Sequence, residues 1–162
     1  FQILIGTQMI AKGHDFPRVS LVTPNLDEAA LLLGLPIAGV GELEPAAHDL
    51  LALGARAVLL KGGHLAGDEL IDLLLGHDAG GAPLRLAAPR IASRNVHGTG
   101  CTLSSAIAAH LALGLPLAGA VTAARAYILR AIAEGAMVRT GTGHGPLNHG
   151  HAPVPTHRLP LH

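Results

Sequence analysis

The sequence predicts a layered α/β protein built around one mixed β-sheet. Short apolar runs alternate with amphipathic stretches that end in glycine or proline, and this alternation is typical of sheets covered by helices. Of the 162 residues, 49% are hydrophobic and 2% are aromatic, so the core must consist of small and aliphatic side chains. A chain of this length usually forms one domain with one core.

The first elements are predicted from β-favouring runs and helix-ending residues. Residues 2–7 and 19–23 predict two short strands separated by a turn. A helix is expected over residues 26–33, because Gly34 can end it in the left-handed conformation and Pro36 prevents its continuation.

The middle of the chain predicts a helix, a strand and a hairpin. A helix over residues 45–53 leads into a buried strand at 57–60. Residues 69–75 and 84–87 flank a glycine-rich segment, so they are expected to pair as an antiparallel hairpin. A mixed sheet follows from this order.

The last third predicts two helices and an irregular tail. Apolar residues recur at helical spacing from Thr102 to a stop at Gly114, and again from 117 to about 137. The glycines, prolines and histidines after Thr140 predict irregular structure. The histidines lack the regular spacing of a metal site, so we expect no resident metal there.

Charge and cysteine content narrow the function classes. The formal net charge is zero, but residues 94–162 carry five arginines against Glu134 alone, which favours a small anionic ligand over nucleic acid. The single Cys101 cannot form an internal disulfide, which favours the cytoplasm. We expect no membrane span and no signal peptide, because charged residues and helix breakers interrupt the apolar runs.

A glycine-rich turn precedes the helix predicted from Thr102. Gly98 and Gly100, with Thr99 between them, let the backbone approach an anion, and the helix dipole favours a phosphate there. A purely structural glycine turn fits the pattern too. Cys101 at the helix start is either a small buried hydrophobic residue or a thiol that orients a substrate hydroxyl.

Three further residues carry candidate chemistry. Lys61 follows the predicted strand at 57–60, where ligand crevices form in open sheets, and it either reaches a phosphate or merely solubilises the strand end. Asn25 and Glu28 share one helix face. Their oxygen atoms suit Mg2+, but the same spacing makes a capping pair that needs no ligand.

Several segments match one family both in their order along the chain and in their residues. Thr-Pro-Asn-Leu-Asp-Glu-Ala at 23–29, Leu-Lys-Gly-Gly-His at 60–64, Ala-Pro-Arg-Ile at 88–91 and the stretch 97–105 together resemble hydroxymethylpyrimidine/phosphomethylpyrimidine kinases, which are ribokinase-like enzymes. The resemblance continues to Gly-His-Gly-Pro at 143–146. The cysteine after Gly-Thr-Gly separates this family from sugar kinases, which usually carry aspartate there.

The resemblance implies a fold and an activity. The fold is an incomplete ribokinase-like three-layer α/β/α sandwich, with a mostly parallel sheet and one antiparallel hairpin. The enzyme is a phosphotransferase of thiamine biosynthesis, which transfers the γ-phosphoryl group of ATP, with Mg2+, to the hydroxymethyl of an aminopyrimidine and then to the phosphate of that product.

The resemblance also implies residue roles. Gly98, Thr99 and Gly100 form the anion hole for the ATP phosphates, Cys101 stands at the catalytic position and Lys61 contacts phosphates. Two more roles concern the metal and the nucleotide: Asn25 and Glu28 serve Mg2+ directly or through water, and Arg125 is a candidate nucleotide contact where the family usually has lysine.

The first residues resemble another protein. Residues 3–17 look like a motif of the primosomal replication helicase, although no G-x-x-x-x-G-K-[ST] loop supports a helicase. We therefore expect a helicase-like strand and turn at 1–20, the C-terminal nucleotide-binding half of a kinase domain at 21–146, and a His/Pro-rich tail at 147–162.

The activity of such a chain is expected to be weak, because the segment at 1–20 stands in place of the pyrimidine-binding half. The alternatives are an inactive nucleotide-binding remnant and a chimeric reading frame. A sheet edge left unpaired would favour a homo-oligomer.

Overall fold

The computed structural model describes residues 3–4, 20–63, 65–139 and 141–153. Within them the strands form one five-stranded sheet in chain order. The strands are β1 (Ile3–Leu4), β2 (Leu21–Val22), β3 (Ala57–Lys61), β4 (Glu69–Gly76) and β5 (Leu84–Pro89).

The sheet is mixed, as predicted, but β4 is reversed against both of its neighbours. β1 pairs with β2 and β2 with β3 in parallel, whereas β4 is antiparallel to β3 and to β5. The predicted hairpin is confirmed. The antiparallel β3–β4 pairing was not predicted, and it arises because the connection over residues 62–68 is too short for the crossover of about a dozen residues that a parallel pair needs.

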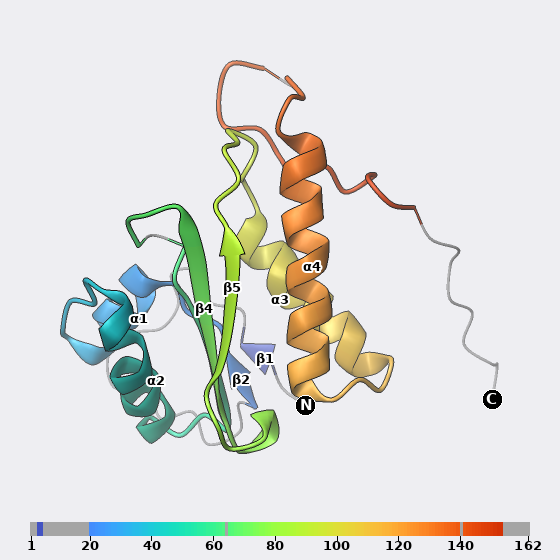
Figure 1. Ribbon diagram of the computed structural model, residues 1–162. Helices are drawn as coiled ribbons and strands as arrows, with labels where there is room; N and C mark the ends of the chain where they lie inside the picture. Colours follow the sequence, from blue (N-terminus) through green and yellow to red (C-terminus); the bar gives the residue numbers. More distant parts are fainter. Residues whose placement is uncertain (1–2, 5–19, 64, 140, 154–162) are drawn as a thin grey trace, which may run out of the picture.

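Helices cover both faces of the sheet, which confirms the three layers. The helices are α1 (Leu26–Leu33), α2 (Leu43–Ala52), α3 (Thr99–Ala112) and α4 (Leu117–Gly135), with short 3-10 turns at Val40–Glu42 and His77–Ala79. Figure 1 shows α1 and α2 on one side of the sheet and α3 and α4 on the other.

The alternation of side chains along β3 supplies both halves of the core. Ala57 and Leu59 belong to the apolar cluster under α3 and α4, whereas Val58 and Leu60 belong to the cluster under α1 and α2. All four are at most 1% exposed. The next residue, Lys61, therefore has the parity of the α3/α4 face.

The end of α1 follows the signal predicted from the sequence, whereas the start of α3 differs from its predicted position. Gly34 ends α1 with φ of 72°. In contrast, α3 begins at Thr99 and not at Thr102, because Gly98 takes φ of 85° and lets the helix start directly after it. The glycine-rich stretch is thus the first turn of a helix.

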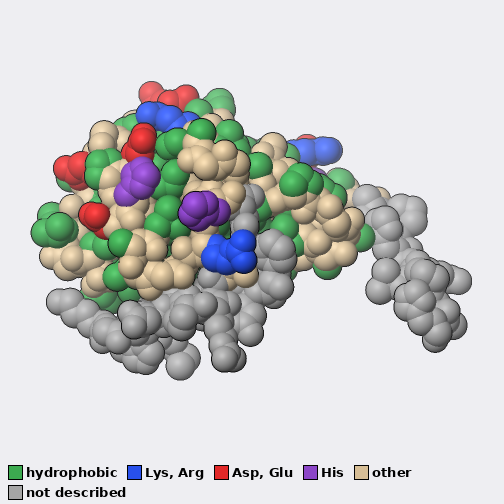
Figure 2. All heavy atoms as spheres, turned by 90° about the horizontal axis from the view of Figure 1, so that it is seen from below, with side chains coloured by type: hydrophobic (Ala, Val, Ile, Leu, Met, Phe, Trp, Pro, Cys, Tyr) green, Lys and Arg blue, Asp and Glu red, His purple; other side chains and the backbone are tan. Residues whose placement is uncertain are grey.

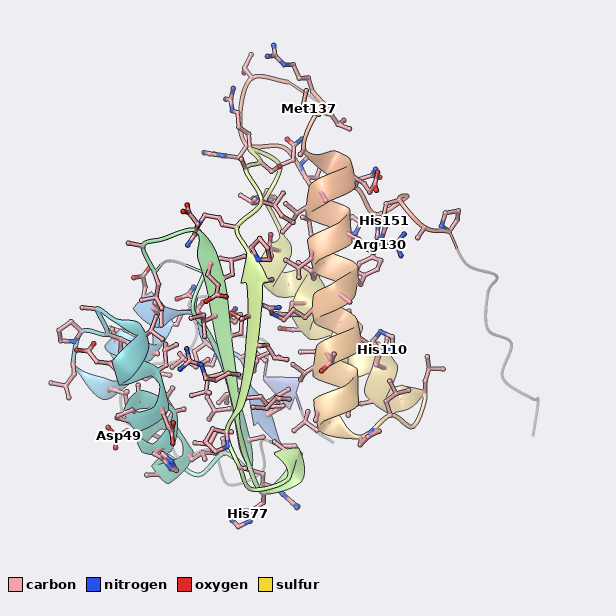
Figure 3. The ribbon with its side chains drawn as sticks, in the orientation of Figure 1. Asp49, His77, His110, Arg130, Met137 and His151 are labelled. Carbon is pink, nitrogen blue, oxygen red and sulfur yellow. The ribbon has the colours of Figure 1, made fainter. Side chains whose placement is uncertain are left out.

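The tail begins as irregular structure that packs on α4. Leu147 is buried in the core, and the Asn148 amide donates to the Ala131 carbonyl at 3.2 Å. His151 packs against Tyr127 of α4, with ring centroids 4.9 Å apart, on the outer side of this helix in Figure 3. Residues 154–162 lie outside the described part, as does most of the helicase-like segment, of which Ile3, Leu4 and Ser20 are described.

Charged residues make up 14% of the sequence. On the face drawn in Figure 2, acidic, basic and histidine side chains are scattered between hydrophobic and uncharged groups. Among the described residues, no helix has both the length and the apolar character that crossing a membrane requires.

Candidate functional site

The carboxyl ends of β2 and β3 bring the first two candidate motifs together. The Lys61 amide donates to the Pro24 carbonyl at 2.9 Å, and Asn25 and Lys61 form a parallel bridge. Since both strands end at the same edge of the sheet, the start of α1 and the lysine after β3 become neighbours.

Asn25 and Glu28 form a complete capping box at the start of α1. The Glu28 amide donates to Asn25 Oδ1 at 2.8 Å, and the Asn25 amide donates to Glu28 Oε2 at 2.8 Å. The structural alternative for this pair is therefore realised. Because the box uses one carboxylate oxygen of Glu28, its Oε1 remains for another partner.

The first turn of α3 presents backbone amides at the same edge. The Thr99 amide donates to the Val96 carbonyl at 3.3 Å and the Thr102 amide to the Gly98 carbonyl at 2.9 Å. The amides of Gly100 and Cys101 lie between them, in the first turn, where a helix supplies no acceptor of its own. These two amides, rather than that of Thr99, are the ones available to an anion.

A buried hydroxyl pair fixes this turn to the sheet. Thr23 Oγ1 lies 3.0 Å from Ser104 Oγ, and Ser104 Oγ donates to the Gly100 carbonyl at 3.2 Å. Thr23 is 4% and Ser104 1% exposed. The bond joins the end of β2 to α3 across 81 residues of sequence, and sequence reasoning missed it.

The Lys61 ammonium lies in a partly desolvated position against this turn. Burial lowers the pKa of Lys61 below its ordinary value of 10.5, while the charges of Glu28, Asp72 and Cys101 act in the opposite direction. A Cβ added to Gly100 would lie 3.3 Å from Lys61 Nζ. The ammonium therefore sits directly beside the first turn of α3.

These groups line one cavity of about 520 Å3. Its wall brings together seven of the eight residues singled out from the sequence: Asn25, Glu28, Lys61, Gly98, Thr99, Gly100 and Cys101. Cys101 is exposed, so it is not the small buried hydrophobic residue that was one of its two interpretations from the sequence. Thr23, Ser104 and His144 also line the wall and were not assigned roles from the sequence.

Arg125 lines an adjoining cavity of about 230 Å3, which shares Lys61 and Gly100 with the first. Its guanidinium is buried and pairs with Asp72, with Nε donating to Oδ2 at 2.8 Å. The rest of this cavity is mostly apolar, with Leu70, Leu103, Ile128, Leu129 and Ile132 in its wall.

The loop after β3 is held by an arginine from the end of β5. Arg90 donates to the carbonyls of Gly67 at 2.8 Å, Gly63 at 3.0 Å and Leu65 at 2.5 Å. The Ala-Pro-Arg-Ile segment was part of the family resemblance without a role. Its arginine fixes the loop that begins beside the cavity.

Comparison with known proteins agrees with the resemblance. The sequence profile of the phosphomethylpyrimidine kinase family matches residues 4–148. The chain belongs to this family. The match begins before residue 21, where the sequence placed the join with the helicase-like segment.

Two curated relatives are hydroxymethylpyrimidine/phosphomethylpyrimidine kinases. That of Rhizobium meliloti is 51% identical over 136 residues, which cover 83% of this chain and 50% of the relative. That of Escherichia coli is 39% identical over 166 aligned positions, which cover 93% of this chain and 61% of the relative. The chain thus spans about half the length of the relatives that it matches.

Solved structures share the fold. Pyridoxal kinase from Staphylococcus aureus in complex with ADP superposes with a TM-score of 0.76 at 33% identity, over 83% of this chain and 49% of that one. A phosphomethylpyrimidine kinase from Clostridium difficile gives a TM-score of 0.56 at 35% identity, over 72% and 44%. The ribokinase-like α/β/α arrangement predicted from the sequence is confirmed.

Proposed function

We propose that this chain binds ATP with Mg2+ and takes part in phosphoryl transfer to the hydroxymethyl group of an aminopyrimidine, and then to the phosphate of the product, in cytoplasmic thiamine biosynthesis. One observation carries the proposal: the Lys61 ammonium, the first turn of α3 and the Glu28 carboxylate line one cavity. A cation, backbone amides and a metal-binding oxygen are the groups that phosphoryl transfer needs, because its catalysis is largely positioning and charge neutralisation.

The phosphates of ATP would lie against the first turn of α3. The segment Gly98 to Gly100 forms the anion hole, in which the amides of Gly100 and Cys101 donate to phosphate oxygens. Lys61 contacts the same phosphates from β3. A bound phosphate places negative charge beside the partly desolvated ammonium and so offsets the free-energy cost of its burial.

Mg2+ would be held by Glu28 and Asn25, directly or through water. The site fits this ion in one respect, since the capping box leaves Oε1 of Glu28 available while fixing the side chain. When bound, the ion neutralises charge on the phosphate oxygens.

Cys101 stands where it would meet the acceptor hydroxyl. Its side chain is exposed and lines the cavity two residues after Thr99. We assign it the catalytic position, in which the sulfur accepts a hydrogen bond from the substrate hydroxyl and orients its oxygen toward the γ-phosphorus.

The apolar adjoining cavity would take the nucleoside. Leu70, Ile128 and Ile132 offer apolar surface to a purine, and the shared wall at Lys61 and Gly100 joins it to the phosphate site. Arg125 is the candidate nucleotide contact there. The solved pyridoxal kinase in complex with ADP supports a nucleotide site in this fold.

Two measurements test the proposal on the chain as it stands. We expect calorimetric titration to detect binding of ADP in the presence of Mg2+, and expect Lys61→Met to abolish it. Formation of ADP from ATP that depends on hydroxymethylpyrimidine, and that is lost in Cys101→Ala, would support the full activity. Nucleotide binding without turnover would support the nucleotide-binding remnant, and failure to bind any nucleotide would contradict the proposal.

A further inference from the structure

Asp72 and Arg125 form a partly buried ion pair beside Lys61, and the proposed transfer chemistry gives Asp72 no role. The Nε and Oδ2 atoms are 2.8 Å apart, and the two side chains are 11% and 14% exposed. Arg125 also donates to the Ala87 carbonyl at 3.3 Å and to the Leu70 carbonyl at 3.2 Å. The guanidinium is therefore anchored on β4 and β5 from its place on α4.

The other oxygen of Asp72 is engaged as well. Asp72 Oδ1 accepts the Gly62 amide at 3.0 Å. An added Cβ on Gly62 would overlap the Ile71 carbonyl oxygen, so the backbone approaches this strand as closely as a glycine allows. Both carboxylate oxygens thus hold fixed partners on either side of the β3 end.

Lys61 is the direct neighbour of this carboxylate. Lys61 and Asp72 are opposite each other in the β3–β4 register, and both have the parity of the α3/α4 face. Side chains of directly opposed residues lie about 5 Å apart at Cβ, within reach of an ion pair. A lysine and an aspartate in this arrangement would normally pair with each other.

We propose that Arg125 and Asp72 are positioning residues, which keep the Lys61 ammonium available to phosphate: Arg125 occupies the carboxylate that would otherwise capture Lys61. Asp72 in turn fixes the Gly62 amide and with it the strand end that carries Lys61. This inference rests on the proposed function, because it assigns Lys61 to the phosphates.

A direct contact between Arg125 and the nucleotide is the competing explanation, because Arg125 lines the adjoining cavity. The two explanations predict different nucleotide affinities when Arg125 and Asp72 are substituted together. If Arg125 acts through Asp72, substituting both residues also removes the carboxylate that would capture Lys61, and the ammonium is again available to phosphate. If Arg125 touches the nucleotide, removal of Asp72 restores nothing.

The test is ADP affinity in the presence of Mg2+ for the wild type, Arg125→Met, Asp72→Asn and the double variant. We expect Arg125→Met to weaken binding about tenfold, within the range for coupled neighbours, and the double variant to regain most of this loss. Arg130→Met is the matched control, since this exposed arginine of α4 points away from the sheet in Figure 3. A double variant that binds no better than Arg125→Met would overturn the inference.

A crystal structure of ligand-free Arg125→Met decides the question without nucleotide. We expect Lys61 Nζ to lie within hydrogen-bond distance of the Asp72 carboxylate, and Lys61 in the double variant to keep its wild-type place. A Lys61 that stays in place in the single variant would contradict the inference. If the wild type binds no nucleotide, the proposed function fails, whereas this structural comparison still decides the role of Arg125.

Discussion

Lys61 is the residue on which both the electrostatics and the chemistry of the site converge. It ends a buried strand, lies beside the first turn of α3 and faces the carboxylates of Glu28 and Asp72. Burial disfavours its charged form, and the lowered pKa is the physical sign of that cost. A ligand that brings phosphate charge to the cavity relieves it.

This cost makes stability depend on pH in a defined direction. Between the lowered pKa in the folded state and the ordinary value of 10.5, the unfolded chain holds the Lys61 proton more tightly. The contribution of Lys61 to the free energy of unfolding therefore rises as the pH increases from the lowered pKa to the ordinary one. We expect the free energy of unfolding of the wild type, relative to Lys61→Met, to increase from pH 7 toward 10.5 in urea denaturation. Profiles that stay parallel would refute the assigned burial.

The Thr23–Ser104 bond gives a second prediction for single residues. Ser104→Ala leaves Thr23 Oγ1 buried without this partner, so we expect a loss of about 1–3 kcal/mol in the free energy of unfolding. Ser105→Ala changes the same residue type at an exposed position of the same helix and should change stability by less than about 0.5 kcal/mol. Equal effects in the two variants would mean that the hydroxyl pair contributes nothing specific.

The elements that carry strong local signals were predictable from the sequence. Asn25, Gly34 and the apolar spacing between them fix α1, whose bounds match the expectation. The start of α3 was misplaced by three residues, because the left-handed Gly98 allows a helix to begin where glycines alone suggest a turn. Helix propensities do not reveal where α3 begins, because its start depends on the φ angle of a single residue, Gly98.

The contacts that complete the site were beyond local reasoning. Asp72 and Arg125 are 53 residues apart, and Thr23 and Ser104 are 81 apart, so no spacing rule links them. One signal was present: Asp72 interrupts the apolar run of β4 between Leu70 and Leu75, and a carboxylate in a largely buried strand needs a partner. The sequence could indicate that such a partner exists but could not identify Arg125.

The end of β3 gives a prediction for an element boundary. Gly62→Ala should cost about 1–3 kcal/mol, because the added Cβ would overlap the Ile71 carbonyl and force the strands apart. Gly63→Ala is the matched control, since a Cβ there would meet no atom within 4 Å. Thermal unfolding of both variants checks this, and equal melting temperatures would show that the close approach is not rigid.

At the scale of the whole molecule, the sheet separates two apolar layers and gathers the site at one edge. The clusters under α1 with α2 and under α3 with α4 are built from alternating residues of the same strands. This layering was predictable from the order of the elements. The reversal of β4 was not predicted, although the short 62–68 connection carries that information.

The central claim is that the first turn of α3, Lys61 and Glu28 form one nucleotide site. Titrating the isotope-labelled chain with a nonhydrolysable ATP analogue and Mg2+, and following the backbone amide resonances, tests it most directly. The account predicts that the amides of Gly100, Cys101, Lys61 and Glu28 shift together with one dissociation constant. The exposed Asp49 of α2, on the side of the sheet opposite α4 in Figure 3, should stay unchanged. Shifts that spare Gly100 and Cys101, or that appear around Asp49 instead, would contradict the account.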